Sequence, residues 1–83
     1  MQYILFVFTT RKDAYRLYDY LLTEGIPAKI VNVPRELSAS CGIAVRAPER
    51  AYRTATWAAR NLRSLIRGYL VYEDRSGQHF RPI

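Results

Sequence analysis

An almost continuous apolar run, Gln2–Phe8 (QYILFVF), constrains the fold of this chain more than any other feature. The run is short and rich in aromatic and branched side chains, which is typical of a strand at the centre of a sheet. Side chains alternate between the two faces of a strand, and here both sets are apolar. The sheet therefore needs a cover on each face. We expect helices on one face and, on the other, a second subunit or the C-terminal segment.

Two amphipathic helices follow from the spacing of apolar residues. Thr10 opens the first, with Asp13 three residues later in a capping-box pattern, and Gly25 ends it. Pro48 begins the second helix and Gly68 ends it. One face of each helix is apolar: Ala14, Leu17, Tyr18, Leu21 and Leu22 in the first, and Ala51, Ala55, Ala58, Ala59, Leu62, Leu65 and Ile66 in the second.

Three further strands are predicted at Lys29–Val33, Gly42–Ala47 and Tyr69–Tyr72. The order β-α-β-β-α-β predicts an α+β, ferredoxin-like sandwich, with two helices on one face of a four-stranded antiparallel sheet. Residues 1–73 form this domain, and residues 74–83 are expected to be a C-terminal tail with a turn of its own. From the two apolar faces of the first strand we also expect a homodimer.

Composition excludes several classes of protein. The 83 residues suit one domain, and no apolar run approaches the roughly 18 residues that span a bilayer. No secretory leader is apparent, so we expect a cytoplasmic protein without a membrane partner. One cysteine cannot form an internal disulfide, and one cysteine with one histidine cannot complete a four-ligand zinc site. We therefore expect no metal and no cofactor.

Cys41 is the candidate functional residue. In the predicted topology the first and third strands are antiparallel neighbours, so Cys41 lies near Thr9, Thr10 and the start of the first helix. A helix N-terminus carries about half a positive charge, and Arg11 and Lys12 add cations where acidic residues are usual. Such surroundings lower the pKa of a thiol and favour the reactive thiolate.

The segment before the third strand completes this candidate site. Arg35 and the hydroxyls of Ser38 and Ser40 could close it from the other side. The alternative is that Cys41 is a small buried hydrophobe, which is the usual place of a free cysteine. A polar segment that ends in Gly42 favours an exposed backbone instead.

These residues resemble a known family. The opening YILFVFTT and the phrase VPRELSASCGIAVRAP are similar to the selenium/sulfur (Se/S) carrier protein-like family of small bacterial proteins, over about residues 2–72. The specific part is Pro34–Gly42, in which Ala39 stands where the family has a small hydroxyl residue. The resemblance implies a thiol that carries sulfur or selenium as a persulfide or selenosulfide. Donor and acceptor proteins would be its partners, and it would be a carrier rather than an independent enzyme.

A non-catalytic module that binds RNA or a protein partner is the alternative. The second helix carries several arginines opposite its apolar face, but the chain lacks the basic-Gly-aromatic phrase of RNA-recognition strands, so we do not expect nucleic acid. Trp57 falls near this polar face and needs a cover, either the tail with Phe80 or a contact with a second subunit. His79, in the tail after a Ser76-Gly77 turn, is expected to be a surface residue.

Overall fold

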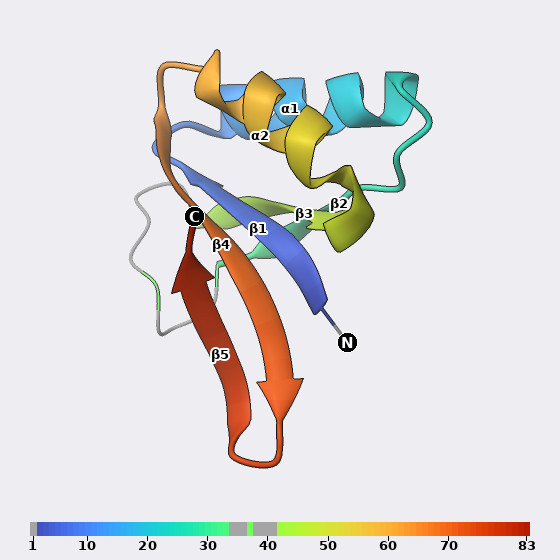
Figure 1. The fold of residues 1–83 in the computed structure, drawn as a ribbon. Helices are drawn as coiled ribbons and strands as arrows, with labels where there is room; N and C mark the ends of the chain where they lie inside the picture. Colours follow the sequence, from blue (N-terminus) through green and yellow to red (C-terminus); the bar gives the residue numbers. More distant parts are fainter. Residues whose placement is uncertain (1, 34–36, 38–41) are drawn as a thin grey trace.

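The structure is a computed structural model that describes residues 2–33, 37 and 42–83. Its described part is an α+β fold, in which two α-helices cover one face of a five-stranded antiparallel sheet with the order β2-β3-β1-β4-β5 (Figure 1). The elements are β1 (Gln2–Phe8), α1 (Arg11–Thr23), β2 (Lys29–Asn32), β3 (Ile43–Pro48), the 3-10 helix η1 (Glu49–Ala51), α2 (Tyr52–Arg60), β4 (Leu65–Asp74) and β5 (Gly77–Pro82).

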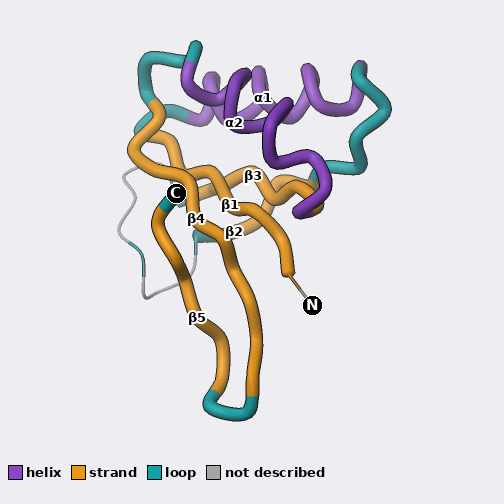
Figure 2. The backbone as a smooth tube through the Cα atoms, in the orientation of Figure 1, coloured by secondary structure: helices purple, strands orange, loops and turns teal. Residues whose placement is uncertain are grey.

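The first four strands have the predicted ferredoxin-like connectivity, but the prediction of a four-stranded sheet is wrong. Residues 77–82, expected to belong to a tail, form β5 and pair with β4 from Tyr69↔Pro82 to Asp74↔Gly77. Without β5, β4 would be an edge strand with a row of unpaired backbone groups. Figure 2 shows the β4–β5 hairpin extending well beyond the layer of helices.

The boundary between α2 and β4 also differs from the prediction. The helix ends at Arg60, and Leu65 and Ile66, which we placed on its apolar face, belong to β4. Ile66 is 46% exposed. The helix stops early because the connection that follows is bound to the start of α1, where Thr9 N donates to Ser64 O at 2.8 Å.

Gly68 has a packing role rather than the helix-ending role that we predicted. It lies in β4 directly opposite Phe6 of β1. A Cβ atom at Gly68 would approach the Phe6 ring to 3.0 Å and Cγ1 of Ile83 to 3.2 Å. A side chain at this position would therefore require the buried Phe6 ring to shift, whereas glycine leaves room for it.

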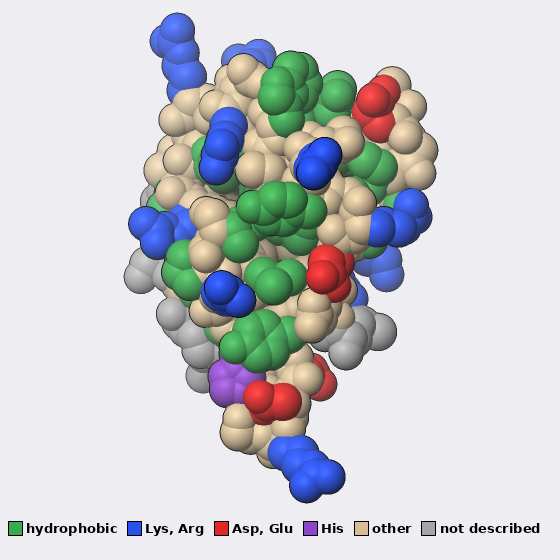
Figure 3. Space-filling model, viewed as in Figure 1, with side chains coloured by type: hydrophobic (Ala, Val, Ile, Leu, Met, Phe, Trp, Pro, Cys, Tyr) green, Lys and Arg blue, Asp and Glu red, His purple; other side chains and the backbone are tan. Residues whose placement is uncertain are grey.

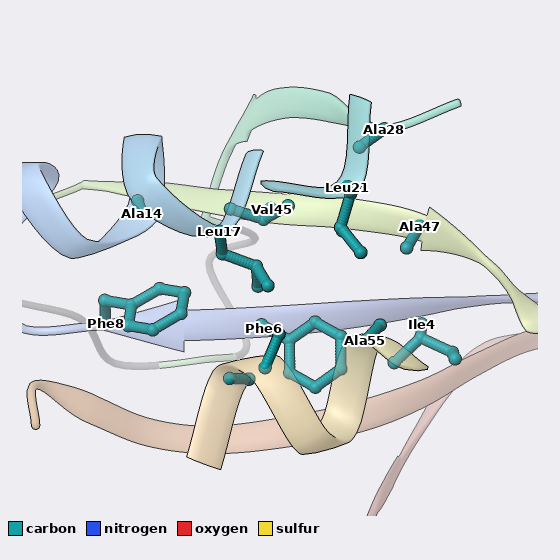
Figure 4. Packing of buried hydrophobic residues seen from close by; sticks show 12 residues of the cluster. Ile4, Phe6, Phe8, Ala14, Leu17, Leu21, Ala28, Val45, Ala47 and Ala55 are labelled. Carbon is teal, nitrogen blue, oxygen red and sulfur yellow. The ribbon is translucent and has the colours of Figure 1, made fainter. Parts of the chain in front are cut away.

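The main core lies between the sheet and the helices (Figure 4). Ile4, Phe6 and Phe8 point from β1 toward this layer, where Leu17 and Leu21 of α1 meet them. The sequence predicted this face of α1, although Leu22 is 46% exposed. The side of α2 that packs here is built of alanines, which lets the helix approach the sheet closely: Ala55, Ala58 and Ala59.

The opposite face of the sheet has a smaller core of its own. Leu5 and Val7 of β1 are each only 1% exposed there, beside the buried Val71 of β4. Phe80 of β5 and Leu37 pack against them. The cover that the apolar second face required thus comes at least partly from the C-terminal segment. The homodimer expected from that face stays a prediction, which light scattering would test.

Candidate functional site

The predicted site residues that the structure describes lie at one end of the sheet. Thr9, Thr10, Arg11 and Lys12 form the junction between β1 and α1, and all four are exposed. β1 pairs with β3 up to Val7↔Ala44, so the end of β1 and the start of β3 share this edge, as the topology predicted. Figure 1 shows the two segments side by side.

Gly42 is exposed and precedes β3 at the same edge. Its backbone has φ of +76°, a conformation that L side chains rarely adopt. Its carbonyl oxygen accepts a hydrogen bond from Val33 N at 3.1 Å, which joins the residues on either side of the segment 34–41. Four predicted site residues fall outside the described residues: Arg35, Ser38, Ser40 and Cys41.

The N-terminus of α1 is capped, but not as a complete capping box. Thr10 is the N-cap, and its Oγ1 accepts a hydrogen bond from Asp13 N at 3.4 Å. The Asp13 carboxylate does not complete the predicted box: its Oδ2 accepts from Ser64 N at 3.0 Å. The first turn of the helix is therefore fastened to the loop between α2 and β4.

Ser64 is a residue of this end that the sequence analysis missed. Its Oγ lies 3.0 Å from Thr10 Oγ1, and its carbonyl oxygen accepts from Thr9 N. Each of these contacts joins residues more than fifty positions apart. Local sequence patterns carry no signal for such a contact.

Ser64 also sets the charge state of Asp13. Hydrogen bonding from the Ser64 side chain is the largest influence that holds the pKa of Asp13 below its ordinary value. The backbone N–H of Ser64 and the cations Arg16 and Lys12 act in the same direction, while desolvation opposes them. Within the described part of the chain, the first two turns of α1 place the Asp13 carboxylate beside the cations Arg11, Lys12 and Arg16. The positive end of the helix dipole adds to these cations, and such surroundings favour an anion.

His79 lies far from this end of the sheet. It pairs with Tyr72, which is opposite Gln2 at the start of β1, whereas Thr9 follows the last residue of that strand. A seven-residue strand spans roughly 20 Å. The described geometry therefore gives no support to His79 as a base for a group beside Thr9.

His79 belongs to a set of local hydrogen bonds that close the β4–β5 turn, and these bonds do not have the arrangement of a catalytic triad. Asp74 Oδ1 accepts from Ser76 N at 2.8 Å and from Ser76 Oγ at 2.6 Å, and lies 2.9 Å from His79 Nε2. Hydrogen bonding, chiefly from the Ser76 side chain, lowers the pKa of Asp74 to about 2. The same Nε2 meets both Asp74 and Ser76, whereas a Ser-His-Asp triad uses the two ring nitrogens separately.

The family described as "Putative Se/S carrier protein-like" matches residues 3–69, from β1 into β4. No curated protein and no solved structure gives a significant match. Among the described residues, neither helix has the length and apolar character needed to cross a membrane. Since the family match covers most of the 83 residues, the chain belongs to the Se/S carrier protein-like family.

Proposed function

We propose that this protein carries sulfur or selenium on the thiol of Cys41, as a persulfide or selenosulfide, between a donor and an acceptor protein in the cytoplasm. Family membership supports the class of function. The observation that carries the proposal is the exposed junction of β1 and α1, where Arg11 and Lys12 stand beside the edge at which Gly42 leads into β3. Cys41 is covalently bonded to Gly42.

The proposed loading step is a transfer of sulfane sulfur. The Cys41 thiolate attacks the outer sulfur of a donor persulfide, R–S–SH, and forms a new S–S bond. The S–S bond of the donor breaks, and the donor leaves as the thiolate RS⁻. Cys41 then carries –S–SH, with the proton still on the transferred sulfur and no net oxidation. Unloading to an acceptor thiolate repeats the same exchange in reverse.

Positive charge at the junction has a defined role in this step. The attacking thiolate is negative, and so is the persulfide once it loses its proton to solvent, so Arg11, Lys12 and the N-terminus of α1 would stabilise both anions. We assign the hydroxyl of Thr9 and the residues Arg35, Ser38 and Ser40 to the same anionic site. Thr10 contributes through the helix cap, because its hydroxyl is already bonded to Asp13 N and Ser64 Oγ. The protein would act as a carrier rather than an independent enzyme.

The rate of alkylation of Cys41 with pH tests the proposal. We expect alkylation at pH 6–7 to be faster than that of free cysteine, because the thiolate is favoured. Replacing both cations, Arg11→Gln with Lys12→Gln, should slow it. The matched control is Arg75→Gln with Arg81→Gln, which removes the same charge from the β4–β5 hairpin and should leave the rate unchanged.

Acceptance of sulfur provides the second measurement. Incubation with a small-molecule persulfide should add the mass of one sulfur atom to the native protein and none to Cys41→Ser, whose circular dichroism should match the native spectrum. A thiol that resists alkylation until the chain unfolds would make Cys41 a core residue and would refute the proposal. So would equal loss of rate in the hairpin control.

A further inference from the structure

A hollow of about 340 Å³ lies between the exposed sides of α1 and α2. Trp57 of α2 forms one wall and Tyr20 of α1 the other, with their ring centroids 6.3 Å apart at a tilt of 46°. Leu17, Ala58 and Leu62 complete its apolar surface. Trp57 is 63% exposed, the largest exposure among the large hydrophobic side chains of the described residues. We refer to this surface as the Trp57 groove.

Arginines surround the Trp57 groove. Arg16 lines it from α1, and Arg53 and Arg60 line a neighbouring hollow of about 370 Å³ that shares Trp57 and Asn61 with it. Residues 50–72 contain five arginines and no acidic residue. Neither Arg53 nor Arg60 forms an ion pair with another described residue. Figure 3 shows Lys and Arg side chains interspersed with hydrophobic ones over this part of the molecule.

Among the residues that the structure describes, none supplies the cover that Trp57 was predicted to need, and this residue stays 63% exposed. Phe80 packs edge-on against Tyr69 in the second core, on the opposite face of the sheet. A second copy is also a poor occupant, because a symmetric contact would bring the same arginines together in a chain of net charge +6.

We propose that the Trp57 groove is a docking site for a protein partner that presents an apolar side chain surrounded by aspartate and glutamate. The apolar side chain would enter between Trp57 and Tyr20, and the carboxylates would pair with Arg16, Arg53 and Arg60. Trp, Tyr and Arg are the residues that most often dominate the binding energy of protein interfaces, where a desolvated centre is ringed by charge.

RNA fits this surface less well than an acidic protein does. Ferredoxin-like RNA-binding modules stack bases on aromatic residues of the open sheet face. On that face of this chain Tyr69 and Phe80 pack on each other and on the second core. In the groove, the Trp57 ring packs at a tilt against Tyr20, so it is not an isolated flat surface on which a base could stack.

The groove also lies close to the candidate functional site. Arg16 is four residues beyond Lys12 on α1, about 6 Å along the helix axis. Both cations act on the same carboxylate, Asp13. A partner docked in the groove would therefore extend toward the junction of β1 and α1. The docking itself requires no chemistry at Cys41 and is tested by binding alone.

The test is selection of peptides against the full chain. A displayed library of random peptides without tryptophan or cysteine is panned on the native protein, and the enriched sequences are synthesised. We expect aspartate and glutamate flanking a leucine, phenylalanine or tyrosine. Because Trp57 is the only tryptophan, its emission should shift to the blue when such a peptide binds.

Two variants and two controls locate the binding site, and the binding of a labelled peptide to each is followed by fluorescence anisotropy. Trp57→Ala should weaken binding about tenfold or more, and Arg53→Gln with Arg60→Gln about fivefold. Arg75→Gln with Arg81→Gln, the same charge change on the hairpin, should weaken it less than about twofold. Cys41→Ser should bind as tightly as the native chain, which separates this proposal from the carrier chemistry.

Several results would overturn the docking proposal. Among these are the absence of any selected peptide, selection without acidic residues, or equal weakening by the hairpin control. Tighter binding of a uridine oligonucleotide than of the peptides, with quenching of Trp57, would instead make the groove a nucleic-acid site. A shift of Trp57 emission with protein concentration alone would make it a contact between copies of this chain.

Discussion

Two clusters in this molecule each contain an aspartate hydrogen-bonded to a serine, but they differ in what they stabilise. At the start of α1, Asp13 accepts a hydrogen bond from the backbone of Ser64 across 51 positions of sequence. At the tip of the β4–β5 hairpin, Asp74 accepts from the backbone of Ser76, only two positions away. In both clusters hydrogen bonding from a serine side chain is the largest influence that lowers the pKa of the aspartate.

The difference in sequence separation decides what each cluster stabilises. Contacts around Asp74 span a few residues and can form in the unfolded chain as well, so the native state gains little from them. Contacts around Asp13 exist only when α1 and the connection before β4 have come together. A lowered aspartate pKa should therefore contribute more to the free energy of unfolding at Asp13 than at Asp74.

The largest effect is expected from Asp13→Ala. The substitution removes the acceptor for Ser64 N and a negative charge at the positive end of α1. We expect the free energy of unfolding to fall by about 1–2 kcal/mol, measured by urea denaturation at neutral pH. Asp19→Ala, an exposed site on the same helix, is the matched control and should change it by less than about 0.5 kcal/mol. Equal effects at the two positions would contradict the assigned role of Asp13.

The pH dependence of stability should follow Asp13 more than Asp74. The folded pKa of Asp13 lies below its ordinary value of 3.8, so between those two values the unfolded state binds more protons. Its stabilising contribution is complete above pH 3.8 and is lost as the pH falls through the folded value. We therefore expect the stabilities of the native protein and Asp13→Ala to converge in acid. A constant difference down to pH 2 (a chosen end point) would argue against the linkage.

The smallest effect is expected from Asp74→Ala, although the pKa of Asp74 falls to about 2. The global unfolding midpoint should stay within error of the native value. Amide exchange at Ser76 should become faster, since its N–H loses the Asp74 acceptor. A clear fall in global stability would show that the hairpin tip matters to the whole fold, and would remove the distinction between the two clusters.

The same distinction explains which parts of the fold were predictable from sequence. The helix α1, from its Thr10 cap to Gly25, follows from local rules, and the structure confirms it. The alternating faces of β1 predicted two cores, because a strand at the centre of a sheet must be covered twice. The end of α2 was mispredicted because the bonds of Ser64 to the start of α1 override a helical pattern that runs on past Arg60.

Within the candidate site, the predicted strand order was a better guide to which residues are neighbours than the residue types were. The adjacency of Thr9–Lys12 and Gly42 followed from antiparallel pairing of the first and third strands. No local sequence pattern indicated that Ser64 belongs to this end of the sheet. Nor did any pattern indicate that the Asp13 carboxylate accepts from Ser64 N instead of completing the capping box. The strand β5 was missed for a related reason: GQHFRP lacks a clear alternation of apolar residues and becomes a strand through its pairing with β4.

The position of β5 also determines where the sheet ends. With β5 in place, the two outermost strands are β2, which has only four residues and carries the exposed Lys29, and β5, which carries Arg81 and Pro82. Short length, charge and proline are the features by which sheet proteins block pairing with a further strand. Both edges are thus poor templates for pairing with a strand of another copy of the chain.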